Sequence, residues 1–177
     1  RLRAVFSQLF VLVEDLLAID KLESGTLELD LNLYNLKDLV SQSVDTLRPQ
    51  AEKRGITLAN KMPDVEVVLD QGRILQVLNN YISNAIKFSR DNSTVEIQGD
   101  IGSKSVTVAV IDTGSGINKA DLPHVFDKFF QSADSERKSK TGFGLGLAIC
   151  KRIIEAHRGE LGAESEAGKG SAFWFRS

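Results

Sequence analysis

The sequence predicts an α+β fold, in which one long helix is followed by a domain of mixed helices and strands. Two hydrophobic patterns support this prediction. In some segments apolar residues recur every three or four positions, as in helices, and in others they alternate with polar residues, as in strands. The 177 residues are enough for one α/β core with a smaller attachment. We therefore expect a helical part at 1–25 and one larger domain at 26–177.

The first segment is predicted to be a helix that packs against other helices. Its apolar residues are spaced by alternating threes and fours, at Leu2, Val5, Leu9, Leu12, Leu16 and Ile19. More apolar side chains widen this stripe beyond a two-stranded seam, at Phe6, Phe10, Val13 and Leu17. The pattern favours a four-helix bundle made by two chains, and the alternative is a helix docked on its own domain. Gly25 is predicted to end the helix.

Strands and helices are then predicted in turn. A strand that opens the main sheet is expected where leucines alternate with polar residues, at Leu27, Leu29, Leu31 and Leu33. Asn35 is expected to cap a helix that Gly55 ends. Further strands are expected at 56–61 and 66–69. Asp70 is then placed to cap a second helix, which carries Ile74, Leu75, Leu78, Ile82 and Ile86.

The rest of the domain is predicted to contain two hairpins, a loop and a helix. The hairpin strands are expected at 94–101, 105–111, 160–163 and 171–175. The polar, lysine-rich run 132–141 has no periodicity, which predicts a mobile surface loop able to close over a ligand. A helix is expected at 145–157, with Gly159 at its end.

Composition argues against two classes of partner. Twenty-two basic and twenty-four acidic residues give a net charge of −2, so the basic field of a nucleic-acid binder is missing. The longest apolar run, 9–13, is far shorter than the ~20 residues of a membrane helix, so this chain is expected to make no membrane contact. The single Cys150 is expected to be a packed residue in a reducing, cytoplasmic compartment. Because the chain begins with Arg1, we expect a fragment of a longer protein, whose membrane anchoring is left open.

Two asparagines on the second predicted helix suggest a metal and phosphate site. Asn80 and Asn84 lie one helical turn apart, so their amides share a face. Amide oxygens are hard neutral ligands suited to magnesium, which takes its other oxygens from water and phosphates. Lys87 lies near the same face and can meet a phosphate as a point charge. Exposed or capping asparagines are the alternative explanation.

A carboxylate and a set of glycines supply the other groups of a nucleotide pocket. Asp112 ends a predicted strand, and an ionised aspartate accepts a hydrogen bond from the exocyclic amino group of adenine. Glycines that permit tight turns follow it, at Gly114 and Gly116. Other glycines alternate just before a predicted helix, where main-chain N–H groups favour an anion, at Gly142, Gly144 and Gly146. A turn or a hinge explains each motif alone, whereas the ordered set predicts an ATP pocket.

Aromatic and basic residues flank the predicted loop. Large rings that could anchor its hinge against the core are those of Phe126, Phe129 and Phe130. Basic side chains that could neutralise phosphate charge when the loop closes are those of Arg137, Lys138 and Lys140. A solvated run of charges is the alternative for these three.

With these motifs in order, the stretch from Leu27 to Phe175 resembles the catalytic ATP-binding domain of sensor histidine kinases, in the superfamily shared with gyrase-type ATPases. Residues 78–89, LNNYISNAIKFS, look like its N box. The resemblance implies a two-layer α/β sandwich, with a mixed β-sheet backed by three helices, and Asn84 as the principal Mg²⁺ ligand with help from Asn80. The implied contacts to ATP come from Asn80, Asn84, Lys87, Asp112, Gly114, Gly116, Ile117, Phe130, Lys140, Thr141, Gly142, Gly144, Leu145 and Gly146.

Residues 1–25 resemble the second helix of the family's dimerisation and phosphotransfer domain. This implies a homodimer through that helix in the full-length protein and a response-regulator receiver domain as partner. The first helix of that domain, which carries the acceptor histidine, is absent, and His124 and His157 are expected to be structural or surface residues. The fragment is therefore expected to bind ATP but not to autophosphorylate.

The residue at position 80 separates two chemistries. Gyrase-like members of the superfamily carry a glutamate there, and the general base that activates water is a carboxylate or an imidazole rather than an amide. Asn80, assisted by Lys87, therefore favours transfer of the γ-phosphate to a histidine. The predicted function is the catalytic core of a two-component sensor histidine kinase. The alternatives are a gyrase-type ATPase clamp and a degenerate nucleotide-binding scaffold.

Overall fold

The computed structural model describes residues 28–131 and 144–177, together with Val13, Leu17 and Asp20. Most of the helix predicted for 1–25, with its end at Gly25, lies outside these residues, as does the loop predicted for 132–141. Val13, Leu17 and Asp20 are helical, in agreement with the first of these predictions.

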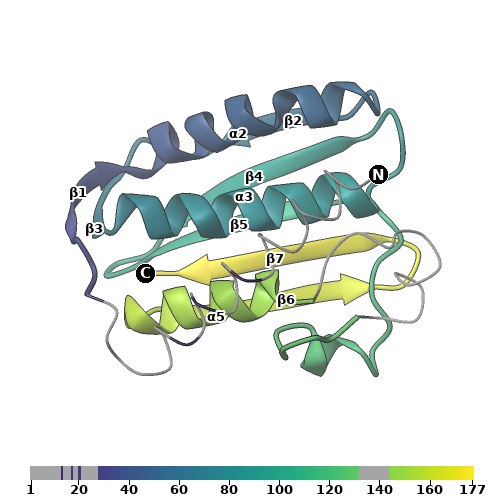
Figure 1. Ribbon diagram of the computed structural model, residues 1–177. Coiled ribbons are helices and arrows are strands. Elements are labelled where there is room, and N and C mark those ends of the chain that lie inside the picture. Colours follow the sequence, from purple (N-terminus) through teal and green to yellow (C-terminus); the bar gives the residue numbers. More distant parts are fainter. Residues whose placement is uncertain (1–12, 14–16, 18–19, 21–27, 132–143) are drawn as a thin grey trace.

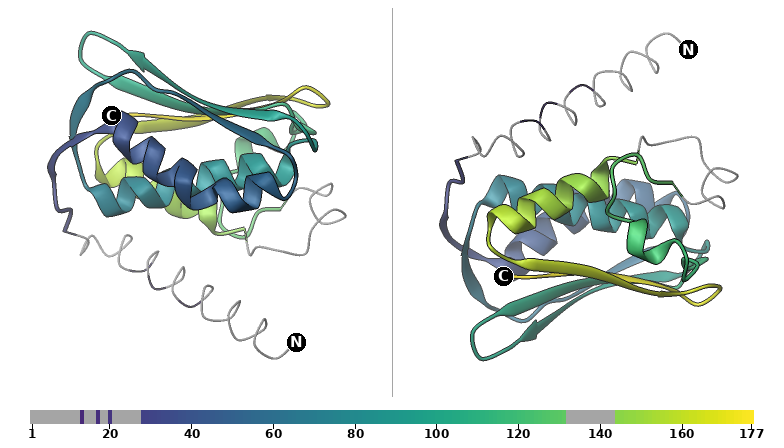
Figure 2. Two further views of the ribbon diagram at one scale, coloured as in Figure 1. Left: turned by 90° about the horizontal axis from the view of Figure 1, so that it is seen from above. Right: turned by 90° about the horizontal axis from the view of Figure 1, so that it is seen from below.

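The described part of the chain forms a two-layer α/β sandwich. Three α-helices lie along one face of a five-stranded sheet, namely α2 (Leu36–Glu52), α3 (Gln71–Phe88) and α5 (Gly146–Ala156) (Figure 1). The strands, in spatial order, are β2 (Thr57–Lys61), β4 (Thr94–Ile101), β5 (Val106–Asp112), β7 (Gly170–Arg176) and β6 (Glu160–Glu166). The pair β2 and β4 is parallel and the other neighbours are antiparallel. The views in Figure 2 show the helices and the sheet as separate layers, which confirms the predicted fold class.

A small second sheet corrects one prediction. The leucine-rich segment does not open the main sheet: its strand β1 (Asn32–Asn35) pairs antiparallel with β3 (Glu66–Leu69), apart from the other strands. Two of its alternating leucines are largely exposed, Leu31 at 50 % and Leu33 at 59 %. An alternating pattern predicts a strand but not its partner. Here α2 begins directly after Asn35, so the strand ends before it can reach the main sheet.

Side-chain caps fix where the first two helices begin. The side chain of Asn35 accepts a hydrogen bond from the backbone N–H of Lys37 at 2.9 Å, and that of Asp70 accepts one from Arg73 at 3.0 Å, as predicted. The predicted end of α5 was wrong in detail. The left-handed residue there is Arg158 (φ +58°), because the helix ends one residue earlier than expected. Gly159 is instead pressed against β7: a Cβ on it would lie 2.4 Å from the carbonyl oxygen of Arg176.

The core lies between α3 and the sheet. In Figure 1, α3 runs between α2 and α5, and its inward face is almost completely buried at Ile74, Leu78, Tyr81, Ile82 and Ile86. Burying one such side chain contributes roughly 1.5–3 kcal/mol. The ring of Tyr81 lies 5.7 Å from that of Phe173 and 6.4 Å from that of Phe175, on β7. The opposite side of α3 is therefore free to carry polar functional groups.

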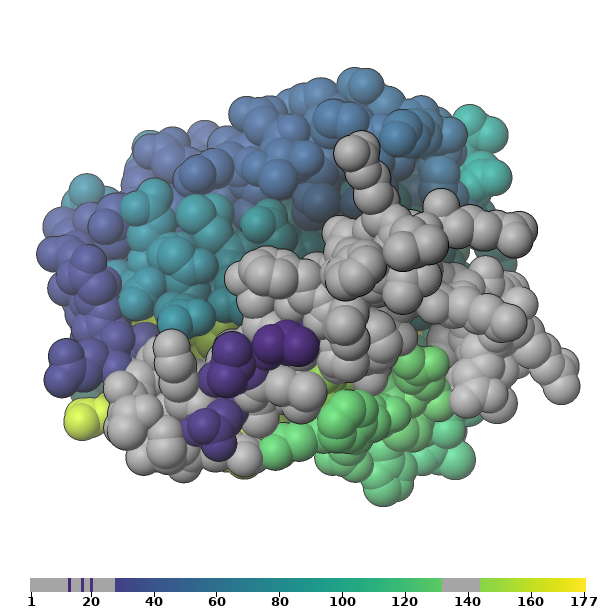
Figure 3. All heavy atoms as spheres, in the orientation of Figure 1, coloured from purple at the N-terminus to yellow at the C-terminus, as the bar shows by residue number. Residues whose placement is uncertain are grey.

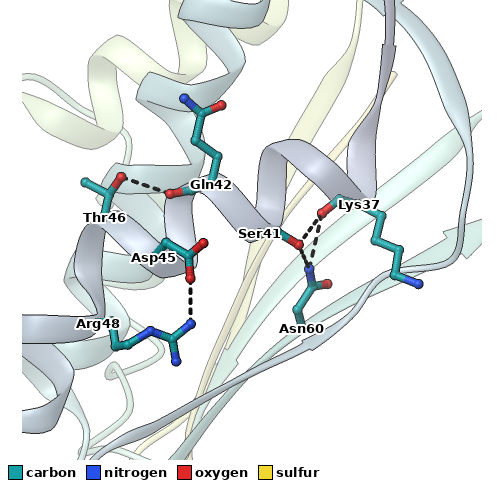
Figure 4. Close-up of polar contacts among 7 residues, drawn as sticks. All are labelled: Lys37, Ser41, Gln42, Asp45, Thr46, Arg48 and Asn60. Atoms are coloured by element: carbon teal, nitrogen blue, oxygen red, sulfur yellow. Dashed lines mark hydrogen bonds and ion pairs between the residues drawn. The ribbon is translucent and has the colours of Figure 1, made fainter.

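Polar contacts join α2 to the edge strand β2. The side-chain amide of Asn60 donates to the carbonyl of Lys37 at 3.2 Å and to the hydroxyl of Ser41 at 2.9 Å (Figure 4). Arg48, further along α2, pairs with Asp45 at 2.6 Å on the exposed side. In the space-filling view of Figure 3, α2 forms the upper part of the molecule, and the segment that contains the short 3-10 helix η1 (Leu122–His124) lies at the lower edge.

Candidate nucleotide site

The two predicted metal ligands lie side by side on α3. The amide nitrogen of Asn84 donates to the amide oxygen of Asn80 at 3.3 Å, and both residues are partly exposed. One helical turn separates them, as the sequence predicted. Among the described residues, no cluster of three or more His, Cys, Asp or Glu side chains could hold a metal ion. The asparagine pair thus offers neutral oxygen ligands, which suit a hard cation that also binds phosphate.

The N-terminus of α5 lies directly against this pair. A Cβ on Gly146, the first residue of α5, would lie 2.4 Å from the amide nitrogen and 2.8 Å from the amide oxygen of Asn80. Only glycine fits there without moving Asn80, so the free N–H groups of the helix end lie beside the amides. Leu145 is 1 % exposed, so its side chain belongs to the core and a ligand could meet only its main chain.

Gly144 connects the start of α5 to the segment that contains Phe126, Phe129 and Phe130. It has a φ of +69°, and its carbonyl accepts a hydrogen bond from the N–H of Phe129 at 2.9 Å. A Cβ on Gly144 would lie 2.6 Å from the carbonyl oxygen of Phe130. Phe126 and Phe130 pack against the core, as predicted, while the loop whose hinge they were expected to anchor lies outside the described residues. Phe129 does not: it is 60 % exposed and has a φ of +61°, because its backbone turns to reach Gly144.

Lys87 lies in the last turn of α3. Its ammonium is 5.1 Å from the centre of the Phe88 ring, and burial lowers the pKa of Lys87. A cleft of about 620 Å³ opens at this end of the helix, lined by Arg54, Lys87, Phe88, Ser89, Arg90 and Ser115. Three of the six lining residues are basic and none is acidic, so the cleft favours an anionic ligand.

Asp112 ends β5, as predicted, and is only 6 % exposed. Burial raises the pKa of its carboxyl, while hydrogen bonds from the backbone N–H groups of Gly114 and Ser171 act in the opposite direction. The contact with Gly114 measures 2.8 Å. A Cβ on Gly114 would lie 2.2 Å from the carbonyl oxygen of Phe88. The aspartate turn is therefore packed against the end of the helix that carries Lys87.

The hairpin β6–β7 supports the rest of this turn. Gly116 has a φ of +66°, and a Cβ on it would lie 2.0 Å from the carbonyl oxygen of Glu166. The N–H of Ile117 donates to the hydroxyl of Ser165 at 2.7 Å. Sequence reasoning missed Ser165, since no motif marks it. It also read Gly170 only as part of a hairpin turn, whereas a Cβ there would lie 2.0 Å from the carbonyl oxygen of Asp112.

Not all predicted residues are placed. Lys140, Thr141 and Gly142 lie outside the described residues, as do Arg137 and Lys138. The two histidines lie in structural or surface positions, as predicted. His124 is exposed and pairs with Asp127 at 2.9 Å. His157 donates from Nδ1 to the carbonyl of Ile153 at 2.8 Å and accepts at Nε2 from the N–H of Asp70 at 3.0 Å.

Comparisons with known proteins agree with this geometry. The model of the family described as histidine kinase-, DNA gyrase B-, and HSP90-like ATPase matches residues 69–177. The chain is 35 % identical over 164 residues to the sensor protein KdpD of Clostridium acetobutylicum, with 93 % of this chain and 18 % of that protein covered. It is 33 % identical over 168 residues to the sensor histidine kinase WalK of Bacillus subtilis, with 93 % and 27 % covered. The chain therefore spans between about a fifth and a quarter of the length of these curated relatives.

Solved structures show the same fold. The full-length ShkA structure, a complex with AMPPNP, has a TM-score of 0.87 and 31 % identity, covering 99 % of this chain and 37 % of that one. The nucleotide-free catalytic domain of histidine kinase ThkA has a TM-score of 0.74 and 28 % identity, covering 84 % and 95 %. Within the described residues, no helix combines the length and the apolar character that a membrane span requires.

Proposed function

We propose a function for this chain from its family: it belongs to the histidine kinase-, DNA gyrase B- and HSP90-like ATPases, and its fold is that of a histidine kinase catalytic ATP-binding domain. From that membership we propose that it is the catalytic core of a two-component sensor kinase, which transfers the γ-phosphate of ATP to a histidine and thence to the aspartate of a response regulator. Dimerisation of the full-length protein through 1–25 and a place in the cytoplasm, where ATP is available, are parts of the same proposal.

One observation carries this proposal: three separate segments converge around α3. The Asn80 amide, which accepts a hydrogen bond from Asn84, lies against the N-terminus of α5, while the Asp112 turn is packed on the carboxyl end of α3. A nucleotide laid along α3 would reach an adenine acceptor at one point and phosphate-binding groups at another. Such convergence of polar groups on one ligand is typical of a built binding site.

Each group has a defined role in this proposal. The carboxylate of Asp112 accepts a hydrogen bond from the exocyclic amino group of adenine. Asn84, with Asn80, would hold Mg²⁺, which neutralises phosphate charge when bound. The main chain of Gly144 and Gly146 at the start of α5 donates to phosphate oxygens, and Lys87 adds a positive charge. These residues bind and orient the triphosphate, and such positioning is most of what phosphoryl transfer requires of a protein.

The amide at position 80 supports a kinase rather than a hydrolase. Asn80 cannot take a proton from water, because an amide is not a general base. The γ-phosphate is thereby preserved for a neutral imidazole, which is itself nucleophilic. A gyrase-type clamp would need a carboxylate in place of Asn80. A degenerate scaffold would need no such convergence of polar groups.

The experiment that tests the proposal supplies the missing acceptor. The chain is mixed with a separately produced dimerisation domain that carries a phosphoacceptor histidine, and γ-labelled ATP is added with Mg²⁺. We expect label on the acceptor domain, little free phosphate, and measurable Mg-ATP binding by calorimetry. Rapid hydrolysis by the unaltered chain would favour the clamp, and no binding at millimolar nucleotide would favour the scaffold. Asn80→Glu is expected to raise hydrolysis at the expense of transfer.

A further inference from the structure

Arg54 makes an unusual set of contacts with the helix that carries the proposed phosphate ligands. It lies in the turn between α2 and β2, and its guanidinium donates to three backbone carbonyls at the end of α3. One nitrogen donates to the carbonyls of Ile86 and of Lys87, the latter at 3.0 Å, and another donates to that of Ser89 at 2.8 Å. Its Nε also donates to the carboxylate of Asp91 at 2.8 Å.

These carbonyls are groups that a helix cannot satisfy by itself. The last four C=O groups of an α-helix have no intrahelical partner, and they carry the negative end of the helix dipole. In α3, the carbonyl of Ala85 is satisfied by the N–H of Ser89 at 2.9 Å, and that of Phe88 meets the N–H of Ser115 at 3.4 Å. Arg54 satisfies the two carbonyls that lie between them. The last turn of α3 is thus held by Arg54 on one side and by the Asp112 turn on the other.

The turn that carries Arg54 is itself anchored. The backbone carbonyl of Arg54 accepts a hydrogen bond from the N–H of Asn92 at 3.0 Å. The next residue, Gly55, has a φ of +64°, and a Cβ there would lie 2.2 Å from the side-chain oxygen of Asn92. The backbone of Arg54 is therefore fixed close to the end of α3, and the planar guanidinium is well placed to bridge several carbonyls.

The contact with Asp91 is the weaker part of this arrangement. The side chain of Arg54 is 33 % exposed and that of Asp91 is 67 % exposed, so solvent screens their ion pair. The bonds to the carbonyls are partly buried and charge-assisted, which makes them the stronger contacts. We therefore expect the carbonyl contacts, rather than the ion pair, to determine the position of the last turn.

We propose that Arg54 is a positioning residue for the triphosphate: it holds the backbone of Lys87 so that this lysine is presented to the phosphates of bound ATP. The inference rests on the proposed function. In this role Arg54 acts through the backbone of Lys87, although its side chain also lines the cleft at the end of α3. Its loss should therefore weaken the binding of phosphate groups and leave recognition of the adenine by Asp112 intact.

The test compares two ligands on four variants. Affinities for Mg-ATP and for adenosine are measured, by calorimetry and by ligand-observed NMR, well below the unfolding midpoint of each variant. Arg54→Gln removes the charged guanidinium, and Arg54→Lys keeps the positive charge without the planar guanidinium. Asp91→Asn removes only the ion pair. Arg48→Gln is the matched control, because Arg48 lies on the exposed side of α2, where it pairs with Asp45 (Figure 4).

For Arg54→Gln we expect Mg-ATP affinity to fall about tenfold, as for other supporting residues one shell away from a ligand, with adenosine affinity unchanged. The Mg-ATP affinity of Arg54→Lys should lie between that of Arg54→Gln and that of the unaltered chain. If Arg54→Gln does not fold, the affinities of Arg54→Lys provide the test. Asp91→Asn and Arg48→Gln should bind both ligands normally. Normal Mg-ATP affinity in the Arg54 variants, or an equal loss for both ligands, overturns the inference. An unaltered chain that binds neither ligand overturns the proposed function instead.

Discussion

At the scale of single residues, the buried carboxyl of Asp112 affects folding stability and the proposed ligand binding in opposite directions. Burial raises its folded pKa, so the folded state holds this proton more tightly than the unfolded chain does. The group therefore stabilises the fold below its unfolded pKa, and that contribution is lost as the pH rises through the raised folded pKa. At neutral pH the ionised carboxylate opposes folding. The proposed contact with adenine gives a reason for a carboxylate at this buried position.

Asp112→Asn should separate the two effects. The substitution removes the buried charge but replaces one acceptor with a donor, so we expect the free energy of unfolding to change by no more than about 1 kcal/mol. ATP affinity should fall about tenfold to a hundredfold, because an amide N–H faces the adenine amino group. Urea unfolding and calorimetry measure the two quantities. A large loss of stability with normal affinity would mean that Asp112 is only structural.

The same carboxyl predicts a pH dependence of binding. In the proposed site the ionised carboxylate is the stronger acceptor for the adenine amino group, so adenosine affinity should fall as the pH is lowered through the raised pKa of Asp112. The decline should begin at a higher pH than an ordinary aspartate would give. In Asp112→Asn the affinity should be low and nearly independent of pH over that range. NMR titration of adenosine from neutral to acidic pH checks this, provided that circular dichroism shows the fold to be intact.

Tyr81 offers a prediction about stability alone. Its side chain is 1 % exposed, and its hydroxyl finds no hydrogen-bond partner among the described residues. Burial also raises the pKa of Tyr81. Because an unsatisfied buried hydroxyl opposes folding, Tyr81→Phe should raise the free energy of unfolding by about 1 kcal/mol and leave ATP binding unchanged. Urea denaturation measures this. Phe173→Leu, which removes the ring contact with Tyr81, is the control and should lower the free energy of unfolding.

At the scale of elements, the turns rather than the helices limit substitution. Gly116 and Gly168 both have positive φ, at +66° and +83°, but only Gly116 is crowded. A Cβ at Gly168 would meet no atom within 4 Å, whereas one at Gly116 would lie 2.0 Å from a backbone carbonyl. Gly168→Ala should therefore cost about 1–2 kcal/mol, which is the conformational penalty alone. Gly116→Ala should cost at least about 3 kcal/mol, because the hairpin must move as well. Thermal unfolding measures both stabilities, and equal losses of stability in the two variants would contradict this prediction.

The elements themselves were largely predictable from local patterns. The caps at Asn35 and Asp70, the helix α3 and both hairpins follow from hydrophobic period and turn chemistry, which act over a few residues. The pairing of β1 with β3 was not predictable, because alternation does not specify a partner strand. Arg54 was missed for a similar reason. Its contacts join residues more than thirty positions apart, and no local signal marks a guanidinium that satisfies a distant helix end.

At the scale of the whole molecule, the proposed site depends on the way in which the fold brings distant segments together. The motifs at Asn80, Asp112 and Gly146 were each identifiable in the sequence, and their common purpose was implied by their order. Their actual contacts depend on tertiary packing: Gly146 on Asn80, Gly114 on Phe88 and Gly170 on Asp112. The two glycines that belong to motifs were predicted to be important for turns and phosphate approach. The structure adds a second reason, since each also allows two elements to touch.

This convergence predicts how ligand binding affects the stability of the whole domain. A nucleotide that contacts α3, α5 and the end of β5 binds only the folded state, so it should raise the unfolding temperature. With Mg-ATP at one hundred times its dissociation constant the gain is about 2.7 kcal/mol, or about 5–10 °C for a domain of this size. Scanning fluorimetry measures the shift. Mg-GTP should give little shift, because guanine carries an oxygen at C6, where adenine carries the amino group that the proposal assigns to Asp112. Asp112→Asn should reduce the shift with Mg-ATP. Chelation of Mg²⁺ should reduce it as well, since the Asn80 and Asn84 amides then meet the triphosphate without a cation. Equal shifts with Mg-ATP and Mg-GTP would show that the phosphates alone are bound and that Asp112 does not read the base.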